Sequence, residues 1–79
     1  MKPDDFVGRF VKLKMQLAST TLPRTVNKSH NIEEIFLIES FKRNNYGKVD
    51  AYVTSSDCEK RIIYALFESG LEHYFEIIQ

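Results

Sequence analysis

Seventy-nine residues are enough for one small domain and too few for a second hydrophobic core. A content of 43% hydrophobic and 28% charged residues is ordinary for a folded protein and argues against intrinsic disorder. The net charge is zero, but residues 1–48 carry nine Lys/Arg against five Asp/Glu and residues 49–79 carry two against six. The two halves therefore differ in sign, while the whole chain lacks the basic charge typical of nucleic-acid-binding proteins.

Cysteine content and the first residues bear on the compartment. Cys58 is the single cysteine, which excludes an internal disulfide and a multi-cysteine metal cluster and fits a reducing compartment. The start, MKPDD, contains two acids and does not resemble a signal peptide. The chain has no run of about 18 apolar residues that would span a membrane. We therefore expect a cytoplasmic protein without a membrane partner.

The first predicted element is a strand from Arg9 to Leu17. Odd-numbered and even-numbered residues differ in polarity in this stretch. The odd positions are Val11, Leu13, Met15 and Leu17, and the even positions are Lys12, Lys14 and Gln16. Period-two alternation predicts a strand with one buried face. Lys, Leu, Met and Gln also form helices well, but the alternation and Gly8 favour the strand. Lys12 and Lys14 would share its solvent face.

Residues 18–31, ASTTLPRTVNKSHN, are predicted to form a long polar loop within a single domain that covers residues 1–79. Arg24, Lys28 and His30 make this loop basic. Loops of this length are unusual in small domains and are often functional. Leu22 and Val26 would anchor it to the body of the domain.

A β-hairpin is predicted from Ile32 to Val53. Its first arm contains a continuous apolar run at 35–38, which is typical of a strand buried on both faces or of one at a tight barrel bend. In its second arm, apolar residues alternate with polar ones, which predicts one wet face. The centre, 42–48, is polar and contains Asn and Gly, which supply the positive φ values that hairpin turns require. We expect this hairpin to be the central pairing of the sheet.

The stretch from Ser56 to Gly70 has two interpretations. In the first, Ser56 and Glu59 form a capping box, Gly70 ends a helix, and apolar residues pair at i and i+4. This interpretation predicts a helix at about 57–69 and an α+β fold of the order β-β-β-α-β.

The second interpretation is a strand. Residues 62–64 are strand formers, and Glu68 to Gly70 suit a three-residue hairpin loop. Lys60 and Arg61 near a helix N-terminus, with Glu68 near its C-terminus, would oppose the helix dipole, so charge favours the strand. The end of the chain, 71–79, is predicted to be a strand docked in the sheet.

No motif predicts catalysis. Cys58 with His30 or His73 has the residue types of a Cys–His pair, but acids near Cys58 oppose thiolate formation. These residues lack metal-ligand spacing, and the three glycines are too isolated for a phosphate-binding loop. We expect no enzyme, no metal, no cofactor and no small-molecule substrate.

Two kinds of macromolecular partner fit the sequence. A basic hairpin tip with a tyrosine, together with the lysines of the first strand, would suit nucleic acid. The candidate binding residues are Lys12, Lys14, Arg24, Lys28, Lys42, Arg43, Tyr46 and Lys48. A protein partner or a homo-oligomer is favoured by the aromatic content and by edge strands that invite β-augmentation. The aromatic candidates for such an interface are Tyr46, Tyr52, Tyr64, Tyr74 and Phe75.

The order of these elements resembles small SH3-like β-barrels. The stretches that carry it are VGRFVKLKM, the polar loop, EIFLIESFKRNNYGKVDAYV and RIIYALFESGLEHYFEII. The resemblance implies a mainly β fold, either a single SH3-like barrel or a strongly bent antiparallel sheet. It also implies a non-enzymatic binding module. We expect a protein-binding, inhibitor or accessory protein of phage or mobile-element type, with nucleic-acid binding as the alternative.

Overall fold

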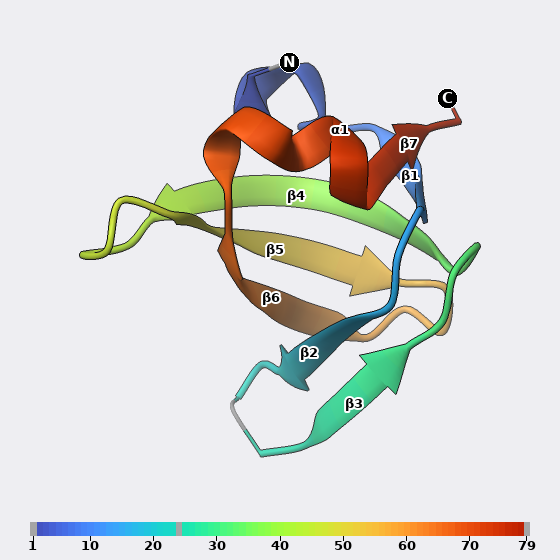
Figure 1. Ribbon diagram of the computed structural model, residues 1–79. Helices are drawn as coiled ribbons and strands as arrows, with labels where there is room; N and C mark the ends of the chain where they lie inside the picture. The colour runs from blue at the N-terminus through green and yellow to red at the C-terminus, as the bar shows by residue number, and fades with distance from the viewer. Residues whose placement is uncertain (1, 24, 79) are drawn as a thin grey trace.

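A computed structural model describes residues 2–23 and 25–78 and shows one antiparallel sheet curled into a half-barrel (Figure 1). The seven strands lie in the order β3-β2-β6-β5-β4-β1-β7. The strands are β1 (Phe10–Leu13), β2 (Leu17–Thr21), β3 (Asn27–His30), β4 (Ile35–Arg43), β5 (Val49–Ser55), β6 (Lys60–Leu66) and β7 (Phe75–Ile77). Three short helical elements join them, namely η1 (Pro3–Asp5), η2 (Glu68–Gly70) and α1 (Leu71–Tyr74). The predicted mainly β fold is confirmed.

The β4–β5 hairpin is central in the sheet, as predicted. Its turn is closed by a hydrogen bond of 2.9 Å from the Asn44 amide to the Lys48 carbonyl. Gly47 supplies a positive φ of 75°. Asn44 acts through its side chain, whose Oδ1 accepts from the amides of Tyr46 and Lys48.

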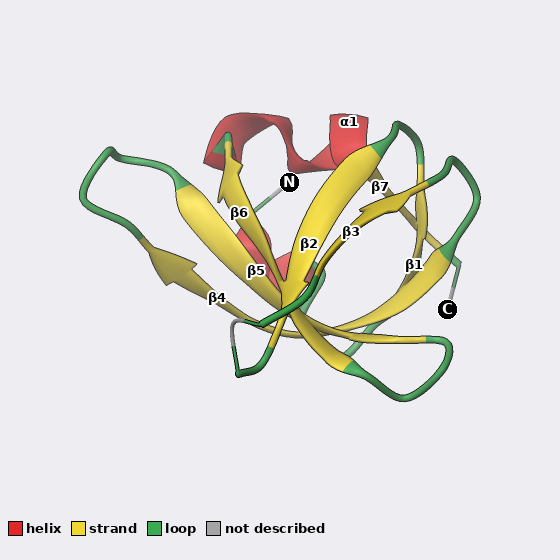
Figure 2. Cartoon of the chain, turned by 90° about the horizontal axis from the view of Figure 1, so that it is seen from below, coloured by secondary structure: helices red, strands yellow, loops and turns green. Residues whose placement is uncertain are grey.

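Two irregularities bend the sheet. One extra residue in β4, between Ile38 and Ser40, forms a bulge against β5 and reverses which parity faces inward. A second irregularity in β6 includes Ala65, at a φ of 59°, whose amide donates to Asp50 Oδ1 at 2.8 Å. Bulges increase local twist and bending, and they account here for the curl of the sheet (Figure 2).

The concave side of the curl holds the hydrophobic core. Strands β1, β4, β5, β6 and β7 contribute, and Phe6, which follows η1, and Leu71 of α1 join the same cluster. The cluster consists of Phe6, Val11, Leu13, Phe36, Ile38, Val49, Ala51, Val53, Ile63, Leu66, Leu71 and Phe75. Figure 1 shows α1 and the N-terminal turn on the same side of the sheet. The core is therefore closed by two short helical segments that cover the concave face.

The predicted long loop at 18–31 is wrong, because most of this segment forms the β2–β3 hairpin. Strands β2 and β3 carry few apolar residues, so the sequence lacked the alternation of apolar and polar residues that predicts a strand. Thr and Ser nevertheless occupy alternate positions, and Ser19, Thr21 and His30 point inward and are buried. A polar inner face is tolerated because its groups are hydrogen-bonded.

Those bonds form a chain of side chains that joins β2, β3 and β6. Arg61 Nη1 donates to Ser19 Oγ at 3.0 Å, and Ser19 Oγ lies 2.5 Å from His30 Nε2. His30 Nδ1 lies 2.7 Å from Glu34 Oε2, and Arg61 Nη2 donates to Glu59 Oε1 at 2.5 Å. A guanidinium only donates hydrogen bonds and a carboxylate only accepts them. Every group therefore has a partner when His30 carries its proton on Nδ1 and the Ser19 hydroxyl directs its proton at His30 Nε2. We call this set the Arg61 chain.

Between Ser56 and Gly70 the strand interpretation is confirmed over Lys60–Leu66, and the helix at 57–69 is wrong. β6 pairs with β5 on one side and with β2 on the other. The predicted three-residue hairpin loop is instead η2, which leads directly into α1. Long-range strand pairing thus outweighed the local capping signals.

Two other strand boundaries differ from the prediction. The terminal strand is confined to Phe75–Ile77, because Leu71–Tyr74 turns as a helix that carries Leu71 into the core. The first strand ends at Leu13, where the chain bends before β2. The Lys14 amide donates to the Tyr74 carbonyl at 2.8 Å in this bend.

Ile38 and Ile35 provide a matched test of the core. Ile38 is fully buried, whereas Ile35 on the same strand is 42% exposed. We predict that Ile38→Ala lowers the free energy of unfolding by about 2–5 kcal/mol, because it leaves a cavity in the core. Ile35→Ala should cost well under that range, as expected for an exposed side chain. Urea unfolding of both variants measures the difference, and equal losses would contradict this arrangement of the sheet.

Ser19 tests the Arg61 chain. Ser19→Ala removes the hydroxyl that links Arg61 to His30 and leaves their buried polar atoms without that partner. We predict a loss of about 1–3 kcal/mol in the free energy of unfolding. The control is Thr20→Ala on the same strand, because the Thr20 hydroxyl bonds Asn27 outside the buried chain. A Ser19→Ala protein as stable as the wild type would show that the chain contributes nothing.

Candidate functional site

Four of the predicted binding residues lie at the β4–β5 tip, and the structure engages three of them with neighbours. Arg43 forms a two-bond ion pair with Glu68. Lys42 Nζ lies 5.1 Å from the ring centroid of Tyr52, and Lys48 Nζ lies 4.7 Å from that of Phe67. Tyr46 projects from the turn and is 87% exposed. The tip therefore presents an aromatic ring, with its cations held along the flanking strands.

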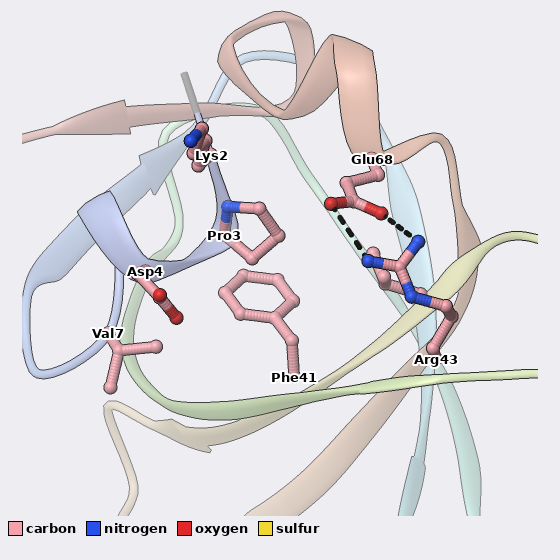
Figure 3. Close-up of a pocket in the computed structure, with 8 residues that line it drawn as sticks. Lys2, Pro3, Asp4, Val7, Phe41, Arg43 and Glu68 are labelled. Carbon is pink, nitrogen blue, oxygen red and sulfur yellow. Dashed lines mark hydrogen bonds and ion pairs between the residues drawn. The ribbon is translucent and has the colours of Figure 1, made fainter.

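A cavity of about 290 Å³ adjoins the tip between η1, β4 and η2 (Figure 3). Pro3 faces the ring of Phe41, and the Arg43 guanidinium points at the Glu68 carboxylate. The lining carries two cations and two acids, Lys2, Arg43, Asp4 and Glu68. Because Arg43 is already paired, this cavity offers no concentrated positive charge for a phosphate group.

The other predicted cations are spread over the fold. Lys12 points outward from β1, with Nζ 3.9 Å from carboxylate oxygens of Glu33 and Glu76. Lys14 directly follows β1 and donates to the Glu72 carbonyl at 2.7 Å, so of the predicted Lys12/Lys14 pair only Lys12 lies on the strand itself. Lys28 is exposed on β3, and Arg24 lies outside the described residues.

Figure 1 places the β4–β5 tip and β1 at opposite sides of the molecule. The tip cations and Lys12 therefore belong to separate surfaces. Within the described ranges, the predicted binding residues do not gather into one site.

The convex face of the sheet carries an apolar cluster that the candidate list lacked. Phe10 and Ile35 are 43% and 42% exposed, and the half-buried Leu37 lies between them in space, paired with Phe10 across β1 and β4. These side chains alternate with the buried Val11, Phe36 and Ile38, so they point away from the core. They border a cavity of about 380 Å³, here called the convex groove, lined by Phe10, Ile35, Leu37, Thr54, Ser55, Ser56 and Cys58.

Charges near the convex groove are neutralised within the chain. On the β1 side, Lys12 lies between Glu33 and Glu76. On the β5–β6 side, Glu39 Oε2 accepts from Lys60 Nζ at 2.6 Å and from the Thr54 hydroxyl at 2.7 Å. Hydrogen bonds from Lys60 and Thr54 hold the pKa of Glu39 below its usual value. The groove is thus an apolar strip with internally paired charges beside it.

The signal for this surface was present but misinterpreted. The apolar run at 35–38 is not buried on both faces, since Ile35 is exposed and Leu37 half-buried. The other interpretation of the run, a tight bend, agrees with the bulge that follows Ile38. Among the residues that the structure describes, no second layer covers the convex face, so the outward half of the run stays open to water. Of the predicted interface aromatics, Tyr46 and Tyr64 are exposed, whereas Phe75 lies in the core.

The Arg61 chain contains a Ser–His–carboxylate sequence, the residue types of a hydrolase triad. Here it links side chains of β2, β3 and β6. Ser19 and His30 are both buried, and Arg61 donates to the oxygen that a nucleophile would use. Cys58 is exposed and lines the convex groove. Across residues 2–23 and 25–78, no three His, Cys, Asp or Glu side chains gather as metal ligands.

No protein-family model, curated protein or solved structure matches this chain. In the described part of the chain, no helix has the length and apolar character needed to cross a membrane.

Glu39 beside the groove gives a pH test. Its carboxylate is favoured in the folded state, so its contribution to stability is present above the ordinary pKa of 4.5 and is lost as pH falls through its lower folded value. We predict that Glu39→Gln is less stable than wild type at neutral pH and that this gap narrows in acid. Urea unfolding across the acid range measures it, and a pH-independent gap would contradict the assignment.

Proposed function

We propose that this protein is a non-enzymatic binding module that docks a partner protein on its convex groove. The observation that carries the proposal is the outward cluster of Phe10, Ile35 and Leu37 on adjacent strands. Single exposed apolar residues are normal on a protein surface, but a contiguous cluster over a groove is typical of an interaction site. Ile78 extends the apolar surface beside Phe10, because its amide donates to the Phe10 carbonyl at 3.0 Å.

The charges favour protein over nucleic acid as the occupant. Lys12 and Lys60 beside the groove are each within 4 Å of carboxylates of this chain. A phosphate backbone would have to compete with those acids, whereas an apolar side chain would meet Phe10 and Ile35 directly. Nucleic acid gains most of its affinity from free Lys and Arg, and this surface does not concentrate them.

The resemblance to SH3-like barrels supports the same proposal, because small barrels of this kind commonly serve as binding modules. A small accessory role, of the type found in phages or mobile elements, fits a single small domain of this kind. The proposed partner is a different protein with an apolar contact surface. A second copy of this chain and a nucleic acid are the alternatives that the experiment separates.

The test is affinity capture from the native cell with matched variants. Phe10→Ser and Ile35→Ser remove the exposed apolar groups of the groove. Val26→Ser is the control, since Val26 is an exposed apolar residue in the β2–β3 connection. We predict that each groove variant weakens recovery of the partner roughly tenfold or more, the scale of an interface hot spot, and that the control retains it.

Light scattering and nuclease treatment complete the experiment. A monomeric chain whose partner survives nuclease treatment supports the proposal. Self-association that Phe10→Ser abolishes would replace it with a homo-oligomer. Capture that nuclease removes, or that all three variants retain equally, would overturn it.

A further inference from the structure

The β2–β6 pairing is much shorter than the strands that form it. β2 covers Leu17–Thr21 and β6 covers Lys60–Leu66, yet their paired positions are Thr20 with Ile62 and Thr21 with Arg61. The ladder between β2 and β6 ends at Thr20, so Ala18 lies beyond it. Figure 2 shows β2 and β6 spreading apart from the point where they meet. The sheet is therefore split along this line.

Strand alternation identifies which backbone groups of β2 face the split. The Thr21 amide donates to Val26 on the β3 side at 2.9 Å, and the Leu22 amide donates to Lys60 on the β6 side at 3.0 Å. Backbone groups of successive residues point to opposite neighbours, so those of Ala18 point toward β6 like those of Leu22. They lie beyond the last paired position of β2 with β6.

A cavity of about 230 Å³ lies at the split. Leu17 and Ile63 contribute apolar surface, and Ala18 and Thr20 contribute small side chains along β2. Ala18 is exposed, so solvent reaches the backbone there. Small residues beside a backbone edge leave room for a further strand to approach.

We propose that the split between β2 and β6 accepts an extended peptide segment of a partner protein, which adds hydrogen bonds to β2 beyond Thr20. A strand is the occupant that matches a line of backbone groups beside a narrow, partly apolar cavity. The alternate side chains of the segment would point toward Leu17 and Ile63. This site is separate from the convex groove and does not depend on its function.

The side chains near the split also argue for an uncharged segment at this position. Ser19, Thr20, Asn27 and Tyr64 are the polar residues of the lining, and none of them is Asp, Glu, Lys or Arg. The Thr20 hydroxyl already donates to Asn27 at 2.7 Å. Selectivity would therefore come from backbone pairing and from a small apolar side chain facing Ile63.

Ala18→Pro is the discriminating variant. Proline removes the Ala18 amide proton, which faces the split. It removes no donor of the β2–β3 ladder, because the odd-numbered residues of β2 donate to β3. Ala18→Val is the matched control, because it adds bulk while keeping that amide. The probe is a phage-displayed library of linear peptides, selected on the full chain, with the best binders synthesised.

We predict that selected peptides bind wild type and Ala18→Val, and that Ala18→Pro weakens them roughly tenfold, the scale of one lost buried hydrogen bond. On wild type, NMR should show peptide-to-protein contacts at Ala18 and Ile63, which keeps the test decisive if Ala18→Pro does not fold. Peptides that contact only Phe10 and Ile35, or a library that yields no binder, would overturn the proposal without touching the groove assignment. An Ala18→Pro protein that folds and binds the selected peptides as tightly as wild type would also overturn the proposal.

Discussion

One-sided burial is the constraint on which this structure depends. A chain of 79 residues builds a single sheet, and its apolar side chains can be covered by one layer only. The sheet curls so that the concave face covers itself, and Phe6, which follows η1, and Leu71 of α1 complete the core. Among the described residues, no such cover lies over the convex face. Apolar residues on that face, such as Phe10 and Ile35, stay exposed. Their presence is therefore not explained by burial that would stabilise the fold.

The β2–β3 hairpin shows how such a small sheet is completed. Its contact with β6 rests on two paired positions and on the Arg61 chain. A short ladder combined with buried side-chain bonds holds the hairpin in place without closing the barrel. The split between β2 and β6 therefore follows from an incompletely closed barrel. The convex face has a different cause, because it is the outer side of a single sheet.

Local chemistry accounts for what could be predicted from the sequence. The β4–β5 hairpin was predictable because its turn residues, Asn44 and Gly47, act within a few positions of one another. The sequence favoured a strand over a helix at β6 without deciding between them, because Ser56 and Glu59 match the pattern of a helix cap. The β2–β3 hairpin was missed because the group that stabilises Ser19 is Arg61, 42 residues further along the chain.

The candidate site was harder to predict for a related reason. The apolar run at 35–38 does not reveal which of its residues lacks a covering layer, and the bulge after Ile38 changes the inward parity. Basic residues such as Lys12 and Arg43 stood out in the sequence, yet their acidic partners are distant in the chain. Exposure and charge pairing are properties of the folded sheet, so residue type alone overestimated the basic tip and overlooked Phe10.

Cys58 offers the most direct measurement of the central claim, that the convex groove is where a partner protein docks. This thiol is exposed, lines the groove beside Phe10 and Leu37, and is the single cysteine of the chain. Its alkylation rate should be measured on the free chain and on the purified complex with the captured partner. Docking in the groove predicts a marked slowing of alkylation in the complex. An unchanged rate in a complex shown to be fully formed would contradict the account.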